Sequence, residues 1–74
     1  VFAERCAQVA FDHQLTPREA EVFEMLARGR NREYIEERLS VSRNTVKAHV
    51  KHIYAKLDIH SHQELIDLVE GKGE

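Results

Sequence analysis

The sequence lacks the residues on which several classes of protein depend. Its 74 residues include one cysteine, one proline, three glycines and no tryptophan, and only 7% are aromatic. The single cysteine, Cys6, has no partner for an intrachain disulfide, which excludes a disulfide-stapled secreted module and fits a reducing cytoplasm. No window approaches the roughly 18 consecutive apolar residues that cross a bilayer, and no charged and apolar leader precedes the domain. We therefore expect neither a secreted nor a membrane-inserted domain.

What remains is the composition of a small folded domain. Hydrophobic residues make up 42% of the chain and charged residues 32%, which is typical of a soluble folded protein rather than a disordered one. A chain of this length leaves little room for a pocket of the usual few hundred cubic ångströms, so we expect no enzyme. Five histidines occur without a cysteine pair or a helical H-E-x-x-H motif, and neither a metal nor a cofactor is predicted. Because the chain opens at Val1 rather than Met, we expect it to be part of a longer polypeptide.

Charge is distributed unevenly along the chain. The total of −2, taken alone, argues weakly against a nucleic-acid partner. Residues 40–57, however, contain four basic residues and no acidic one, whereas residues 58–74 contain one basic and five acidic residues. A segment of one sign between neutral and acidic segments produces a local field that attracts polyanions. The alternative is a solvated helix face that happens to be basic.

Cap signals and apolar spacing predict the first of four helices near the N-terminus. Residues 1–14 have no clean start or stop signal, and we interpret them as a linker or the tail of a preceding helix. Thr16 and Glu19 form a predicted capping box, Pro17 suits the first helical position, and Gly29 closes the helix. The predicted apolar stripe of this helix comprises Ala20, Val22, Phe23, Leu26 and Ala27.

Two further helices follow with a tight turn between them. Asn31 caps a short second helix that ends near Ser40, and Ser42 caps a longer third helix. The predicted inward residues are Tyr34, Ile35 and Leu39 in the second helix, and Val46, Val50, Ile53 and Leu57, with Tyr54 beside them, in the third.

The fourth predicted helix is short and strongly apolar. Ser61 and Glu64 form a second predicted capping box, and residues 71–74 are expected to fray at the C-terminus. Its apolar residues are Leu65, Ile66, Leu68 and Val69. They either pack against the first helix or form a self-complementary surface between two copies. The predicted fold class is all-α, a compact four-helix bundle that contains a helix-turn-helix.

The second and third helices, joined by residues 40–42, form a helix-turn-helix arrangement. A helix of about 10–12 Å diameter fits the major groove of B-DNA, which is about 12 Å wide. Lysine donates to guanine acceptors, and an alanine methyl packs on a thymine methyl. Lys47, Ala48 and Lys51 are therefore the best-placed residues to contact bases. Arg43, Thr45 and the free N–H groups at the start of the third helix would contact phosphates.

Two strings of residues carry a resemblance to a known family. Residues 15–22 are LTPREAEV and residues 42–57 are SRNTVKAHVKHIYAKL. Over about residues 15–70 the chain resembles the LuxR-type (GerE-type) helix-turn-helix DNA-binding domain. The resemblance implies the C-terminal output domain of a larger transcriptional regulator in the cytoplasm. It also implies binding to double-stranded DNA as a homodimer on an imperfect inverted repeat, with RNA polymerase as a further partner.

The resemblance also implies roles for individual residues. The third helix would contact bases through Lys47, Ala48 and Lys51, and the fourth helix would form the dimer contact. The residues expected at the DNA backbone are Arg32, Ser42, Arg43, Asn44, Thr45, His49 and Lys56. Those expected at the dimer contact are Leu65, Ile66 and Val69.

The chain departs from the family pattern around the second helix. Family members commonly open this helix with Ser-Asn-Lys-Glu-Ile-Ala, whereas this chain has NREYIE there. Glu33 stands where a lysine often meets phosphate, so any backbone contact from this helix falls to Arg32 or Arg30. Glu36 replaces a small residue usually packed at the helix crossing, so the second helix lies slightly differently, or the carboxylate reaches outward or pairs with a base such as Arg32. His62 occupies a position often held by arginine.

Two other functions compete with this interpretation. Region 4 of sigma factors has a similar Leu-Thr-x-Arg-Glu opening, which would make the chain a module associated with RNA polymerase. A protein-interaction domain that kept the helix-turn-helix shape and lost DNA binding is compatible with the acidic last helix. The LuxR-type interpretation is favoured by the matches at Thr45-Val46-Lys47 and Ile53-Tyr54.

Overall fold

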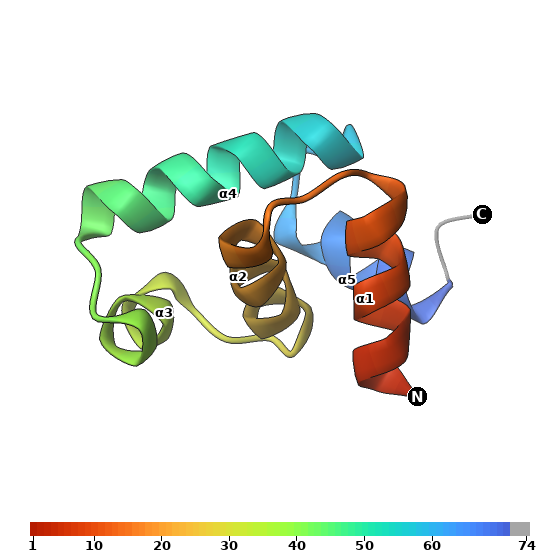
Figure 1. Ribbon diagram of the computed structural model, residues 1–74, viewed down its shortest axis with the longest axis horizontal. Coiled ribbons are helices and arrows are strands. Elements are labelled where there is room, and N and C mark those ends of the chain that lie inside the picture. The colour runs from red at the N-terminus through yellow and green to blue at the C-terminus, as the bar shows by residue number, and fades with distance from the viewer. Residues whose placement is uncertain (72–74) are drawn as a thin grey trace.

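The computed structural model describes residues 1–71, which form five helices and no strand (Figure 1). The helices are α1 (Phe2–Asp12), α2 (Pro17–Ala27), α3 (Arg32–Leu39), α4 (Arg43–Leu57) and α5 (His62–Glu70). The prediction of an all-α fold is confirmed, and α2 to α5 correspond to the four expected helices. Of the residues expected to fray, Gly71 caps α5 in the left-handed conformation, and residues 72–74 lie outside the described part.

Helix α1 brings the helix count to five rather than four. Its N-cap, Val1, makes no side-chain capping hydrogen bond, so the sequence contains no start signal for it. Packing stabilises it instead, because Cys6 and Ala10 are buried and Phe2 and Val9 pack against the core. These four residues recur at i, i+4, i+7 and i+8, which is the spacing of one helix face. Contact with α2 and α5 therefore decides the structure of a segment that is ambiguous by itself.

All four predicted N-caps are confirmed. The Thr16 hydroxyl accepts a hydrogen bond from the Glu19 N–H at 3.1 Å, and the Glu19 carboxylate accepts one from the Thr16 N–H at 3.0 Å. Asn31, Ser42 and Ser61 each accept a backbone N–H three residues later. The box predicted at the start of α5 is incomplete, because its glutamate accepts from the Ser61 hydroxyl and from the preceding backbone N–H rather than from the Ser61 N–H. These caps define where α2 to α5 begin.

One hydrophobic core joins the helices. Helix α2 lies at its centre and contacts α1, α4 and α5, while α3 packs against α4 (Figure 1). The predicted stripe of α4 is buried along its whole length. The largest fully buried side chains are those of Phe23, Ile35, Ile53, Leu65, Val22 and Val46. Burial of one face of α4 leaves the opposite face to solvent.

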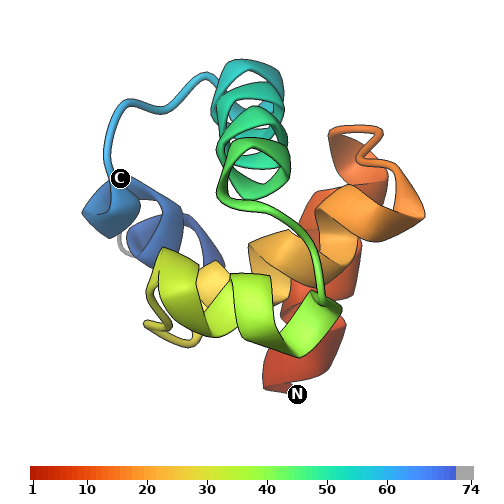
Figure 2. The same cartoon turned by 90° about the vertical axis from the view of Figure 1, so that its left-hand side faces the viewer.

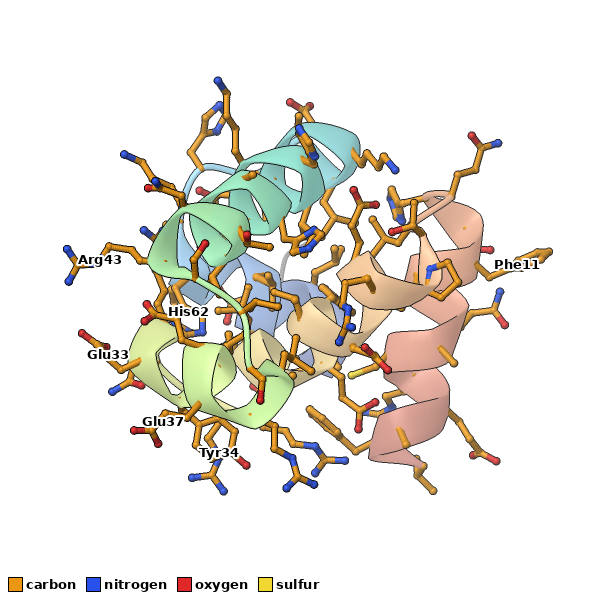
Figure 3. The ribbon with its side chains drawn as sticks, turned by 60° about the vertical axis from the view of Figure 1, so that its left-hand side comes forward. Phe11, Glu33, Tyr34, Glu37, Arg43 and His62 are labelled. Atoms are coloured by element: carbon orange, nitrogen blue, oxygen red, sulfur yellow. The ribbon has the colours of Figure 1, made fainter. Side chains whose placement is uncertain are left out.

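Two aromatic side chains lie outside this core. Tyr34 was predicted to face inward but is 37% exposed, with the Arg30 guanidinium 4.6 Å from its ring centroid. The prediction was wrong because Ile35 and Leu39 alone fill the contact that α3 makes with the core. Phe11 at the end of α1 is 80% exposed and projects away from the other helices (Figure 3).

The turn formed by residues 40–42 sets α3 and α4 as a helix-turn-helix pair (Figure 2). Ser40 ends α3 in the left-handed conformation with a φ of 55°, and the Val41 N–H donates to the Glu36 carbonyl at 3.1 Å. Ser42 then caps α4 directly. No helix within residues 1–71 is long and apolar enough to span a membrane.

Candidate nucleic-acid interface

Helix α4 presents an exposed face opposite its buried stripe. Asn44, Ala48 and Lys51 are exposed and recur at i, i+4 and i+7, which places them together on this outward face. Arg43 and Lys47 are exposed along one edge of it. The face carries basic, amide and methyl groups but no acidic side chain. The structure therefore places the three residues predicted to contact bases on one accessible surface.

The first turn of α4 is organised by two hydroxyl groups. The Ser42 hydroxyl accepts the Thr45 N–H at 3.2 Å, and the two hydroxyl oxygens are hydrogen-bonded at 3.0 Å. Both residues are exposed. The other N–H groups of a first helical turn have no acceptor within the helix, and the helix dipole makes this end positive. The start of α4 is thus suited to an anion.

Four of the residues predicted at the DNA backbone lie along the two flanks of α4. Arg43 lies on the flank that faces α3, where it shares a hollow with Arg32. Thr45, His49 and Lys56 recur at i, i+4 and i+11 on the other flank, which faces the start of α2. A helix inserted into a groove has one DNA strand along each flank, so these two sets would meet different strands.

A buried carboxylate ties the second flank of α4 to α2. The side chain of Glu19 is 6% exposed, and its Oε1 accepts the Lys56 ammonium at 2.7 Å. The same ammonium donates to the Gln14 carbonyl at 3.1 Å. His52 Nδ1 lies 3.7 Å from the other carboxylate oxygen. This arrangement connects the N-terminus of α2 to the last turns of α4 and fixes the position of the exposed face.

The charge on Glu19 depends on these partners. Burial disfavours the ionised form, but the hydrogen bonds from Lys56 and the Thr16 N–H outweigh it and lower the pKa of this carboxyl below its usual value. Lys56 stays a predicted backbone contact, although its ammonium is already engaged within the domain. Sequence reasoning assigned Glu19 only to a capping box, because its partner lies 37 positions away and no local signal marks the pair.

A hollow of about 520 Å³ opens between α3, the first half of α4 and the start of α5. In Figure 3, Glu33 and Arg43 project on the side of the molecule where this hollow opens. Its lining residues are Leu26, Arg30, Asn31, Arg32, Glu33, Glu36, Arg43, Lys47, Tyr54 and His62. Four of them are cationic and two are carboxylates. The hollow is therefore a basic surface that continues the basic edge of α4.

His62 is one of the residues that line this hollow. Its Nε2–H donates to the Leu26 carbonyl at 2.6 Å, which joins the first residue of α5 to the last turn of α2. The hydrogen bond requires that Nε2 carry a proton, because a carbonyl oxygen can only accept. Residues 1–71 contain no group of three or more His, Cys, Asp or Glu side chains that could hold a metal ion. His62 thus has a structural role between two helices.

The apolar residues of α5 are divided between the core and the surface. Leu65 is fully buried and Val69 is 4% exposed, and both belong to the core of this chain. A dimer contact through either side chain stays a prediction, although both are covered within this chain. Ile66 is half-buried and remains accessible at the surface. Of the two interpretations of this stripe, packing within the domain accounts for Leu65 and Val69.

Comparison with known proteins decides the family. The model of a family described as "Bacterial regulatory proteins, luxR family" matches residues 13–69. The chain belongs to this family. The expected LuxR-type helix-turn-helix domain is thereby confirmed, and the match includes the whole of α2, α3 and α4.

Several curated proteins are similar to this luxR-family chain. The uncharacterized response regulatory protein YgeK of Escherichia coli K12 is 46% identical over 55 residues, which are 74% of this chain and 37% of YgeK. The nitrate/nitrite response regulator protein NarL of the same strain is 40% identical over 52 residues, 70% of this chain and 24% of NarL. The oxygen regulatory protein NreC of Staphylococcus haemolyticus is 43% identical over 53 residues, 72% of this chain and 24% of NreC. The matched part of the chain thus spans between 24% and 37% of the length of these relatives. No solved structure was found to match it.

The departures of this luxR-family chain from the family pattern cluster at the hollow. Glu33 is exposed and Glu36 is half-buried, and both line the hollow. Neither carboxylate forms an ion pair with Arg32 or with any other basic group among residues 1–71. Of the outcomes predicted for Glu36, pairing with Arg32 is therefore not observed in the described part of the chain. His62, in place of the common arginine, provides the contact with the Leu26 carbonyl.

Proposed function

We propose that this luxR-family domain binds double-stranded DNA in a sequence-specific manner and thereby regulates transcription. The observation that supports it most is the exposed basic face of α4, which lies opposite a fully buried stripe and is braced by the Glu19–Lys56 pair. Helix α4 has the diameter of the major groove, and its 15 residues are long enough to cross it. Two of the relatives are named as response regulators, which agrees with a regulatory role. Such a protein acts in the cytoplasm, where bacterial DNA lies.

In this proposal the residues of α4 have two different tasks. Lys47 and Lys51 donate to guanine acceptors, and the Ala48 methyl packs on a thymine methyl. The phosphates are contacted by a second set, which fixes the register of the helix without specifying sequence. That set comprises Arg32, Ser42, Arg43, Asn44, Thr45, His49 and Lys56. Lys56 takes part only if it leaves Glu19 or contacts a phosphate with its remaining donor.

Two copies of the domain bind an imperfect inverted repeat in this proposal. Their α4 helices would enter successive major grooves about 34 Å apart on the same side of the duplex. The outer surface of α5 contacts the second copy. Ile66 is accessible on this surface, whereas Leu65 and Val69 are buried within their own chain. Because little apolar area on α5 is accessible, the dimer is weak in solution and forms on DNA.

Selection from a randomised duplex library tests the proposal. The wild-type chain is expected to enrich an inverted motif, and the double variant Lys47→Glu, Lys51→Glu is expected to enrich nothing. The matched control is Arg38→Glu, which reverses an exposed charge on the flank of α3 that faces α2. This control should enrich the same motif as the wild type. Failure of the wild type to enrich any motif at low salt, with a native circular dichroism spectrum, would refute the proposal in favour of a protein-interaction domain.

A further inference from the structure

Helix α1 carries a large apolar side chain that the fold leaves uncovered. Phe11 is 80% exposed and projects away from the other helices (Figure 3), whereas Cys6 and Ala10 bury another side of α1 in the core. The whole of α1 precedes residues 13–69, which the luxR-family model matches, so its outer surface lies outside the matched domain. A single exposed phenylalanine needs no explanation by itself. Its surroundings decide whether it belongs to a contact.

A hollow of about 160 Å³ lies between α1 and α2, one helical turn before Phe11. Its lining residues are Cys6, Ala7, Ala20, Glu21 and Glu24. Ala7 and Phe11 are neighbours on one side of α1, because they stand at i and i+4. A cavity of about 150 Å³ can hold a benzene molecule, so the hollow has room for a phenylalanine ring. Phe11 of the same chain does not fill it, since that side chain points into solvent.

A projecting side chain and a hollow on the same side of one helix form a self-complementary surface. In a two-fold pair each patch meets the same patch of the second copy, so a side chain that projects must find its hollow on that patch. Phe11 and the hollow beside Ala7 meet this requirement. The two helices must run antiparallel, because a parallel two-fold pair would set Phe11 against Phe11 and leave both hollows empty.

Charged side chains on the other flank of this exposed face fit the same arrangement. Arg5 and Asp12 are both exposed and stand at i and i+7 on one flank of α1. A two-fold axis across an antiparallel pair sets each flank against the same flank of the second copy. If Phe11 lies opposite Ala7 of the second copy, Arg5 lies within one residue, about 1.5 Å along the axis, of the level of Asp12. Opposite charges therefore meet twice across the contact.

The charges beside the hollow do not oppose this contact. Glu21 is paired with Arg18 at 3.1 Å, and Glu24 is paired with Arg28 at 2.8 Å. The entering ring thus meets carboxylates that are already neutralised within α2 and its C-cap. The edge of an aromatic ring is also its positive part, which suits the neighbourhood of a carboxylate.

We propose that α1 pairs with α1 of a second copy of this chain in an antiparallel, two-fold contact. Each Phe11 ring occupies the hollow beside Ala7 of the other copy, and Arg5 pairs with Asp12 on the outer flank. The contact differs from the α5 surface of the proposed DNA-bound dimer and requires no DNA. Two phenylalanine side chains bury about 150–250 Å² each, well below the roughly 1,200 Å² of a stable interface. The pair is therefore weak and transient.

Sedimentation equilibrium of the chain without DNA, from about 0.05 to about 2 mM, tests the proposal. The average mass of the wild type should rise with concentration from 8.6 kDa towards twice that value. Phe11→Ala should weaken association about tenfold or more, because it removes both rings from the contact. Tyr34→Ala is the matched control: it removes an exposed aromatic side chain on α3, which Figure 3 shows far from Phe11, and should change nothing.

An exchange of charges tests the antiparallel register. Arg5→Asp and Asp12→Arg each place like charges together at two symmetric positions, so each should weaken association about three- to tenfold. The double variant Arg5→Asp, Asp12→Arg restores both opposite-charge pairs and should associate within about twofold of the wild type. The same variants at about 1 M salt should differ little, because exposed charges are then screened.

Three results would overturn the inference, and none of them bears on DNA binding. The wild type could stay at 8.6 kDa over the whole range, which would show that no second copy covers α1. Association that Phe11→Ala leaves unchanged would place the contact elsewhere, for example on α5. A double charge variant as weak as the two single variants would exclude the antiparallel register. Thermal unfolding of each variant confirms that these exposed substitutions leave the fold intact.

Discussion

Substitution of Lys56 by methionine should destabilise the domain through Glu19. The change keeps the length of the side chain but removes the ammonium that lies 2.7 Å from a carboxylate with 6% exposure. Breaking a hydrogen bond to a buried charged group costs about 1–3 kcal/mol, and surface ion pairs contribute at most about 1 kcal/mol. Because Lys56 is 34% exposed and the Thr16 N–H still donates to the carboxylate, we expect a loss of about 1–2 kcal/mol. For a domain of this size each kcal/mol lowers the melting temperature by about 4–8 °C.

The stability lost in Lys56→Met should depend on pH in a direction that follows from the lowered pKa of Glu19. A carboxyl whose pKa is lower in the folded than in the unfolded state stabilises the fold at neutral pH and loses this contribution as pH falls through the folded-state pKa. The groups that face it are Lys56, His52 and the Thr16 N–H. In Lys56→Met the effect of burial on the pKa of Glu19 is no longer offset by the ammonium, so the difference in stability between wild type and variant should shrink as pH falls through the range in which Glu19 becomes protonated.

Urea unfolding followed by circular dichroism at pH 7 and at pH 3 measures both effects. Glu19→Gln keeps an acceptor for the Thr16 N–H and removes the charge, so the double variant with Lys56→Met isolates the coupling between the two side chains. A coupling energy below about 0.3 kcal/mol at pH 7, or a loss that is the same at both pH values, would contradict the reasoning. His52→Asn is the matched control, since His52 Nδ1 is 3.7 Å from the carboxylate and 60% exposed.

Three further predictions concern the core, a turn and base recognition. Val46→Ala should lower the free energy of unfolding by about 1–3 kcal/mol because Val46 is fully buried, and a Val46→Asp variant with a wild-type melting temperature would disprove the buried stripe. Gly29→Ala should lower the free energy of unfolding by about 1–2 kcal/mol. The loss would come from the left-handed backbone alone, because Gly29 has a φ of +85° and an added Cβ would meet no atom within 4 Å. An unchanged urea midpoint would contradict this. Lys51→Ala should relax base preference at one position of the enriched motif by about 1–3 kcal/mol, and selection with an unaltered motif would exclude Lys51 as a base contact.

Local signals predicted the elements that have their own caps. Thr16, Asn31, Ser42 and Ser61 each start a helix in the structure where the sequence places them, because a capping side chain bonds to an N–H only three residues away. The stripe of α4 was equally predictable, since the 3.6-residue period depends on sequence spacing alone. The outward position of Lys51 then follows from helix geometry.

Signals that depend on distant partners were not visible in the sequence. Helix α1 has no cap and forms because α2 and α5 cover its apolar face. Apolar residues such as Leu65 and Val69 are equally suited to a dimer contact and to the core of one chain. Their burial in the core follows from the packing of α5 against α2 and α1, which the sequence does not show.

Residues a few positions apart are enough to predict the family, the caps and the face of α4 that stays outside. Which charges find partners depends instead on how the helices pack in three dimensions. That packing places the Lys56 ammonium on the buried Glu19, 37 positions earlier, and leaves Arg32 and Arg43 around one hollow without an ion pair to any carboxylate of residues 1–71. The physical reason is that ion pairs and hollows depend on distances between helices, which no spacing along the chain specifies.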